Sequence, residues 1–471
     1  MIIDRSIILT GLFLVLIFPA SMFTFSAHAQ EGVYDDTWYT GQSSFVKIAV
    51  TQDGVYQVTG AELAQAGLSL TAVNPDNIRL LKNGVEVPIW IEGETPSSLA
   101  ENDAIVFVGE QNRGDEELWA FEEIEQRQGS DYFSLFSDTT WYWLSWQDVQ
   151  GITPLRYMDT DPLQTIAGLQ TIEATDEVDH LEEDVAYYFG DSNDAAQPQY
   201  TRGEGFVWLS FTHIDSNPID RVIPVLLDNL SPNADSVHIE VKLSSASGTQ
   251  HLVELRIEAN GSSLECDQCT DSEEWNGYSF RSLTVSIPTS LIGAATTLNA
   301  VVTSRNDFSS TANRILIDWL EASYSRSLNI DKPQQTFTAD AGAQSFQLTQ
   351  SVNQETVVFN PDDHRRFFLG NAASFTLNDN PTDQTRYWVS SNASYLSSQT
   401  ILTHTVQDLS AETEVVDYLI ITTPALLESA QALADYRSQQ DGYTTRIVFQ
   451  NDIFDQFDYG RPTPLAIRRF V

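Results

Sequence analysis

The sequence predicts a multidomain, mainly β protein that ends in the incomplete start of a parallel α/β domain. Three observations support this fold class. The chain has 471 residues, too many for one hydrophobic core. Residues from about 35 to 407 form short apolar runs separated by turn residues, which is typical of β-sheets. After Asp417 the pattern changes to strand, helix and strand, as in a parallel α/β unit.

The N-terminal part, residues 30–160, is predicted to be a β-rich α+β domain. The runs 46–50 and 55–58 flank residues 52–54 (Gln-Asp-Gly), which predicts a hairpin. A second hairpin is predicted at Asn83-Gly84. Thr59 and Glu62 have the spacing of a capping box, so a short helix is expected there.

Residues 161–330 and 331–412 are predicted to form two further β domains. The first has regularly spaced strands and no long helical pattern, which indicates a β-sandwich of the jelly-roll type. Its clearest strands are 222–227, 237–243, 252–259, 283–287, 298–303 and 315–324. The second is a small β domain with strands expected at 345–348, 356–359, 367–369 and 400–405.

The α/β pattern occupies residues 413–471. Residues 418–421 and 445–449 are apolar runs without alternation, as expected for strands covered on both faces. Thr423-Pro424 predicts the start of the helix between them, with the hydroxyl as its cap. The apolar stripe and the glycine expected at the end of that helix are Leu426, Ala430, Leu433, Ala434 and Gly442.

A second helix is expected to start at Thr463-Pro464, and the sequence ends inside it. Two strands and part of their helical cover cannot bury their own apolar faces. We therefore expect residues 413–471 to be the beginning of a larger domain.

Residues 1–29 have the features of a secretory signal peptide. Arg5 precedes an apolar run, and residues 27–29 (Ala-His-Ala) fit the small-x-small pattern of a cleavage site. An uncleaved N-terminal anchor is the alternative. No later segment has the length and apolar character of a membrane-spanning helix, so we expect a secreted or cell-surface protein.

The formal net charge of −42 excludes nucleic acid and anionic membranes as partners, because both would be repelled. We interpret the charge as a means of solubility, with cation capture as the alternative. His180 belongs to one acidic run with Asp179, Glu182, Glu183 and Asp184. Such a run is typical of a solvated face, although it could also bind a cation.

The two cysteines, Cys266 and Cys269, are predicted to form a disulfide that closes a polar loop. In an exported protein this is the usual state of such a pair. The sequence offers no second Cys-x-x-Cys or histidine pair that would complete a zinc site, and free thiols remain the other alternative.

Gly190-Asp191-Ser192 resembles the nucleophile block of a lipase-like esterase, but the Asp-x-x-His that this chemistry needs is missing. We interpret it as a turn.

The C-terminal residues carry a family resemblance. Residues 417–424, the run 452–457 (Asp-Ile-Phe-Asp-Gln-Phe) with Tyr459-Gly460, and Pro464-x-Ala-Ile-Arg resemble the start of a gingipain-type cysteine peptidase domain. Residues 46–56, 74–80, 141–144 and 202–208 are similar to the β-rich region before the peptidase in large secreted members.

The resemblance implies a caspase-like α/β domain in which a Cys–His dyad cleaves peptide bonds of protein substrates. In the family both residues lie beyond later strands than those present here. After Asp417 this sequence contains neither histidine nor cysteine, so no catalytic residue is assigned. We assign no cofactor and no metal site; the resemblance leaves calcium open for the whole protein, without support from this sequence.

Two hypotheses follow from the sequence. In the first, the chain is the N-terminal region of a secreted gingipain-like cysteine endopeptidase and is itself inactive. In the second, it is a cell-surface β-sandwich protein for binding or assembly, with a vestigial peptidase-like segment.

Overall fold

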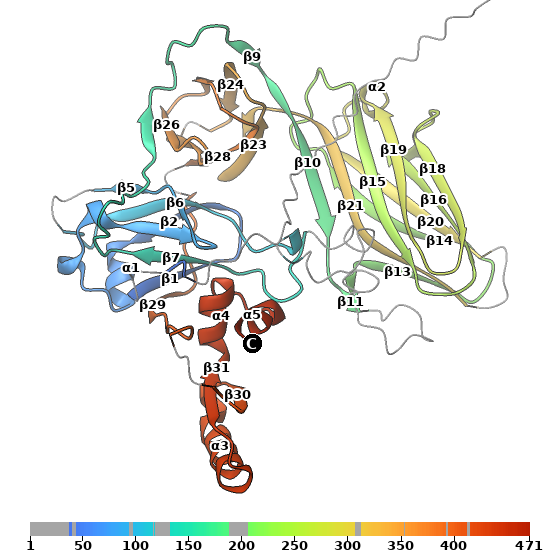
Figure 1. Ribbon diagram of the computed structural model, residues 1–471. Helices are drawn as coiled ribbons and strands as arrows, with labels where there is room; N and C mark the ends of the chain where they lie inside the picture. Colours follow the sequence, from blue (N-terminus) through green and yellow to red (C-terminus); the bar gives the residue numbers. More distant parts are fainter. Residues whose placement is uncertain are drawn as a thin grey trace, which may run out of the picture.

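The structure is a computed structural model that describes residues 37–39, 44–93, 98–115, 117, 132–187, 206–306, 312–352, 354–391, 394–411 and 415–471. The predicted signal peptide lies outside the described residues, as does Gly190-Asp191-Ser192. Figure 1 shows an N-terminal β unit, a long β-sandwich beside it, a third group of strands above, and a helical C-terminal segment below. The prediction of a mainly β chain is confirmed.

Two sheets form the N-terminal unit. One has the strand order β29-β1-β7-β3-β4 and the other the order β2-β6-β5. Apolar side chains from both sheets pack with helix α1 in one core that includes Ile48, Val58, Leu63, Phe107 and Leu144. The elements are β1 (Ser44–Val50), β2 (Gly54–Thr59), α1 (Gly60–Gln65), β3 (Arg79–Lys82), β4 (Val85–Val87), β5 (Trp90–Glu92), β6 (Ala104–Gly109), β7 (Thr140–Ser145) and β29 (Ile401–Thr405).

Two of the three local predictions for this unit are confirmed. Asn83-Gly84 joins the antiparallel strands β3 and β4, and both residues have positive φ, as a tight hairpin turn requires. Thr59 and Glu62 form the complete capping box of α1. The hairpin at residues 52–54 is wrong: β1 pairs with β29 and β7, whereas β2 pairs with β6, so this turn connects two different sheets.

The β-sandwich is also confirmed. One sheet has the order β10-β21-β15-β19, with β13 also paired to β21, and the other has the order β14-β20-β16-β17, with β18 also paired to β16. Alternate residues of the long strands point into a shared core, which includes Val241, Leu255, Leu283 and Leu320. The strands are β10 (Ala174–Glu182), β13 (Leu209–His213), β14 (Ile219–Leu226), β15 (Ser236–Ser245), β16 (Gln250–Ala259), β17 (Ser262–Ser263), β18 (Thr270–Asn276), β19 (Phe280–Pro288), β20 (Thr297–Arg305) and β21 (Asn313–Ser327).

The third group of strands has a core of stacked aromatic rings, with Phe337 and Tyr387 4.8 Å apart between centroids. Its sheets have the orders β23-β28-β25-β26-β8 and β22-β24-β27, with β9 paired to β24. Strands β8 and β9 precede the β-sandwich in the sequence, so this group is assembled from both sides of it. The strands are β8 (Met158–Thr160), β9 (Gln170–Ile172), β22 (Asn329–Ile330), β23 (Gln334–Ala339), β24 (Gln344–Gln350), β25 (Thr356–Asn360), β26 (Arg365–Gly370), β27 (Ser374–Asp379) and β28 (Thr385–Ser391).

The C-terminal segment has the predicted βαβ order. Strands β30 (Tyr418–Thr422) and β31 (Thr445–Phe449) are parallel neighbours, and α3 (Leu427–Asp441) connects them and ends at Gly442 with φ 70°. Helices α4 (Gln450–Asp458) and α5 (Pro464–Phe470) follow. Figure 1 shows α4 and α5 close to the N-terminal unit, with β30, β31 and α3 extending away from it.

Two details predicted for α3, its cap and its apolar stripe, are wrong. Thr423 makes no side-chain cap, because a short 3-10 turn (Pro424–Leu426) precedes α3. Of the predicted apolar stripe only Ala430 and Ala434 are buried, whereas Leu426 is 58% exposed. The start at Thr463 is confirmed, since its hydroxyl accepts a hydrogen bond from the Ala466 amide.

Candidate functional site

The candidate site is the contact between α4 and the outer face of the first sheet. Strand β1 lies between β29 and β7 in its sheet, and its alternate residues point away from the core of the N-terminal unit. Lys47 on this face pairs in register with Trp143 of β7. The helix α4 lies over these side chains and buries them, so this contact joins the N-terminal unit to the segment that carries the family resemblance.

A buried ion pair holds the two parts together. Lys47 Nζ lies 2.5 Å from Asp455 Oδ1, and the two side chains are 10% and 3% exposed. The Lys47 ammonium also lies over two indole rings, 4.4 Å from the Trp141 centroid and 4.6 Å from that of Trp143. The negative faces of these rings attract the cation, so the lysine is stabilised on more than one side.

The second oxygen of Asp455 faces His404 of β29. His404 Nε2 lies 2.7 Å from Asp455 Oδ2, an ion-pair distance without hydrogen-bond geometry. One turn earlier on α4, burial and the neighbouring Asp455 raise the pKa of Asp452, although His404 opposes this. The carboxylate of Asp455 therefore joins two strands of the first sheet to one helix.

Tryptophan side chains of the N-terminal unit donate hydrogen bonds to backbone carbonyls at the C-terminal end of α4. The last carbonyls of a helix have no partner within it. The Trp143 indole N–H donates to the Tyr459 carbonyl at 2.9 Å, and the Trp38 indole N–H donates to the Gln456 carbonyl at 3.2 Å. Tyr459 itself has φ 55°, in the left-handed region that ends the helix.

The same contact requires close approach of the two backbones. A Cβ at Gly84, in the β3–β4 turn, would come within 2.7 Å of the Tyr459 ring. A Cβ at Gly460 would come within 2.9 Å of the Trp141 ring. The two turns therefore fit together only because both positions are glycines.

Charged groups at the turn between α4 and α5 are also paired. Asp458 is buried and accepts hydrogen bonds from Arg461 and Arg469 at 2.9 Å each, and from the Thr463 hydroxyl. This carboxylate fixes the turn between α4 and α5. The Lys47 ammonium and the Thr463 hydroxyl are both engaged with carboxylates, so these side chains hold the C-terminal segment in position.

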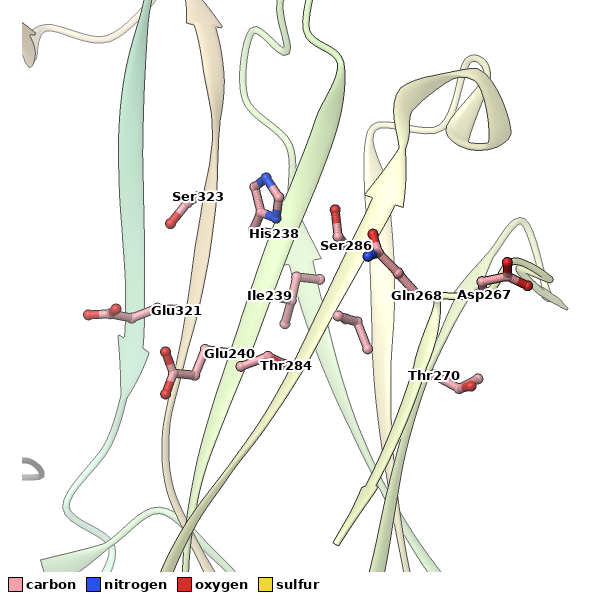
Figure 2. A pocket seen from close by; sticks show the side chains of 11 residues that line it. His238, Ile239, Glu240, Asp267, Gln268, Thr270, Thr284, Ser286, Glu321 and Ser323 are labelled. Atoms are coloured by element: carbon pink, nitrogen blue, oxygen red, sulfur yellow. The ribbon is translucent and has the colours of Figure 1, made fainter. Parts of the chain in front are cut away.

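A second candidate lies on the β-sandwich, where a groove of about 570 Å³ crosses the outer face of the β15 sheet. Figure 2 shows its polar lining, with Glu240 between Glu321 and Thr284 on neighbouring strands. One wall is the loop that contains Cys266 and Cys269, which are joined as a disulfide in the structure. The Gln268 carbonyl of this loop accepts a hydrogen bond from the Ser286 amide at 2.9 Å.

The interpretation of His180 as part of a solvated face is wrong. Its side chain is 7% exposed, and its two ring nitrogens lie 2.8 Å from Glu182 and 2.9 Å from Glu321. In the part of the chain that the structure describes, no set of three or more His, Cys, Asp or Glu side chains is arranged to hold a metal ion.

Sequence reasoning missed the residues that form the junction. Lys47, Trp143 and Tyr459 all lie in the runs that resemble the peptidase family, but nothing in the sequence relates them to one another. The available signal was two tryptophans at alternate positions, Trp141 and Trp143, and a lysine within the predicted strand 46–50, because a buried lysine needs a partner. None of the helices in the described residues has the length and apolar character of a membrane span.

Comparison with known proteins agrees with the family resemblance. Residues 411–471 match Peptidase family C25. The structure is similar to that of dimeric latent PorU from Porphyromonas gingivalis, with a TM-score of 0.60 and 17% sequence identity. The similarity covers 91% of this chain and 39% of that chain, so this chain spans about two fifths of its length. The predicted resemblance to the gingipain-type family is thereby confirmed.

Two other solved structures match with low TM-scores. They are the Arthrobacter globiformis T6 isomalto-dextranase complexed with panose (9% identity, 59% of this chain and 35% of that chain) and the infectious bursal disease virus VP2 subviral particle (9% identity, 85% and 72%). Their TM-scores are 0.17 and 0.20, too low to support an argument. No curated protein matches the sequence.

Proposed function

We propose that this chain is the N-terminal region of a secreted gingipain-like cysteine endopeptidase, and that its first β unit is the platform on which the peptidase domain is built. The observation that supports this proposal is the junction itself. The segment that matches Peptidase family C25 is attached to the first sheet through the buried Lys47–Asp455 pair and two indole hydrogen bonds.

The chemistry belongs to the whole protein. A cysteine peptidase needs a thiolate nucleophile and a histidine that transfers the proton, both in one site. The two cysteines here are joined to each other in the β-sandwich, and residues after Asp417 include no histidine. This chain spans about two fifths of the PorU chain, so we propose that the dyad lies in a part of the peptidase outside it, with proteins or peptides as substrates. The proposed division keeps the predicted signal, three β domains and peptidase start, with two changes of boundary. The strand predicted at 400–405 for the small β domain is β29 of the first sheet, and β8 and β9 belong to the third group of strands.

A recombinant protein that extends beyond Val471 tests this function. The extended protein is expected to cleave peptide substrates in a thiol-dependent reaction that iodoacetamide blocks, and the 471-residue chain is expected to show no turnover. Iodoacetamide-sensitive cleavage by the 471-residue chain would contradict the proposal. An extension without histidine and cysteine would also contradict it.

The alternative is a surface protein that binds a ligand through the β-sandwich. The groove beside the disulfide loop favours it, because a polar depression of about 570 Å³ is large enough for a small ligand. In this alternative the C25-like segment would serve assembly only. Binding of glycans or peptides to the 471-residue chain, lost on changing Glu240 and Ser323, would support it.

A further inference from the structure

The side chain of Tyr132 lies between two cationic groups from different parts of the molecule. Its ring stacks on the His180 imidazole, with 3.9 Å between centroids and an interplanar angle of 16°. The Arg113 guanidinium carbon lies 4.3 Å from the same ring centroid. Both groups therefore lie within contact distance of the same tyrosine ring.

Both cationic groups are held by carboxylates. Arg113 pairs with Asp53 at 2.6 Å, and Asp53 also accepts the Gln111 amide at 2.9 Å. Arg113 and Tyr132 lie between β6 and β7, and Asp53 lies between β1 and β2, so these three belong to the N-terminal unit. His180 belongs to β10, which pairs with β21 in the β-sandwich. The stack therefore connects the two units.

His180 is positively charged in this arrangement. Both of its ring nitrogens face carboxylate oxygens, one of Glu182 and one of Glu321. Burial lowers the pKa of His180, but these hydrogen bonds and charges outweigh burial and raise the pKa to about 9. An imidazolium is attracted by the face of a tyrosine ring more strongly than a neutral imidazole.

Other charged groups surround His180. Burial, Glu182 and Asp138 raise the pKa of Asp184 to about 6. Since Asp138 precedes β7 in the N-terminal unit, its charge and that of ionised Asp184 repel each other across the two units. Burial also raises the pKa of Asp318 well above its usual value, with Lys242 and His180 opposing this, and Glu240 lies opposite Glu321 in the sheet.

We propose that Tyr132 is a latch that holds the β-sandwich against the N-terminal unit, and that the charge on His180 sets the strength of this latch. This inference is independent of the proposed peptidase function. It assigns to the acidic run at residues 179–184 a conformational role that the sequence did not indicate.

The direction of the pH dependence follows from the two titrating groups. The pKa of His180 is higher in the folded state, so its contribution is fully present below about 6.5 and is lost as the pH rises through about 9. The repulsion between Asp184 and Asp138 appears as the pH rises through about 6. Both groups therefore make the latch tighter in acid and weaker in alkali.

Spin labels on the full chain test the proposal. Cysteines introduced as Val85→Cys in the N-terminal unit and Val222→Cys in the β-sandwich occupy exposed positions, and pulsed electron spin resonance measures the distance between them. We expect one narrow distance distribution at pH 7 that broadens at pH 10. We call a molecule closed when the β-sandwich lies against the N-terminal unit and open when the two have separated. Tyr132→Ala is expected to raise the ratio of open to closed molecules at pH 7 by roughly 5- to 30-fold, which corresponds to the free energy of a cation over an aromatic ring.

Matched variants separate the stack from other effects. Tyr132→Phe keeps the ring and is expected to remain within about twofold of the parent ratio, while His180→Gln should open the latch at pH 7 and remove the change between pH 7 and 10. Tyr436→Ala, on exposed α3, is the control that changes nothing. The proposal is overturned if Tyr132→Ala matches the parent, if Tyr132→Phe opens the latch as far as Tyr132→Ala does, or if His180→Gln keeps the pH dependence.

Discussion

Replacing Lys47 by methionine tests how α4 is attached to the first sheet. The methionine keeps most of the apolar length of the side chain but removes the charge, which leaves Asp455 buried without its closest cation. Removing one partner of a buried pair typically costs about 3–5 kcal/mol. Since the Lys47 side chain is still 10% exposed and water can partly replace it, we expect the lower end of this range, about 3 kcal/mol.

A loss of about 3 kcal/mol corresponds to a roughly hundredfold change in an opening equilibrium. Hydrogen exchange measured by mass spectrometry is the assay, because the amides of α4 exchange when the helix leaves the sheet. We expect their protection to fall about a hundredfold in Lys47→Met, while the β-sandwich amides keep theirs. The double variant Lys47→Met/Asp455→Leu should recover most of the protection, since an apolar pair of similar volume is often neutral or stabilising.

Lys82→Met is the matched control for this prediction. Lys82 of β3 pairs with Glu110 at the same 2.5 Å, but the two side chains are 26% and 42% exposed. Exposed pairs contribute only about 0–1 kcal/mol, so this variant should leave the α4 amides unchanged. Equal effects of Lys47→Met and Lys82→Met would refute the argument that burial of the pair attaches the helix.

Three further predictions concern the turns, the cysteines and the C-terminal strands. In a thermal unfolding scan, Gly84→Ala should lower the unfolding temperature more than Gly261→Ala. Both positions have positive φ, but only Gly84 packs against Tyr459, the C-cap residue of α4. Equal losses would show that this contact is unimportant. Alkylation without reductant should leave Cys266 and Cys269 unlabelled in the intact mass, and two labels would contradict the disulfide. Limited proteolysis should cut within residues 411–449 before the β-sandwich, since a two-stranded sheet has little cover; first cuts in the β-sandwich would argue against this order.

The sequence by itself determined the local features of this protein. The hairpin at Asn83-Gly84 and the capping box of Thr59 and Glu62 depend on residues within a few positions of one another, so their geometry follows from local backbone preferences. The βαβ order after Asp417 was predictable for the same reason, since hydrophobic periodicity and a glycine at the helix end are local signals. The family resemblance added the expected function of the whole protein.

Only the tertiary structure decided which distant segments meet. Residues 52–54 have the composition of a hairpin turn, yet β29, some 350 residues later, pairs with β1 and leaves β2 to another sheet. Lys47 and Asp455 likewise meet across about 400 residues, and His180 is buried by a tyrosine from another unit. Such contacts form where the gain from burial exceeds the entropy of closing a long loop. That balance depends on the packing of whole sheets and not on any short stretch of sequence.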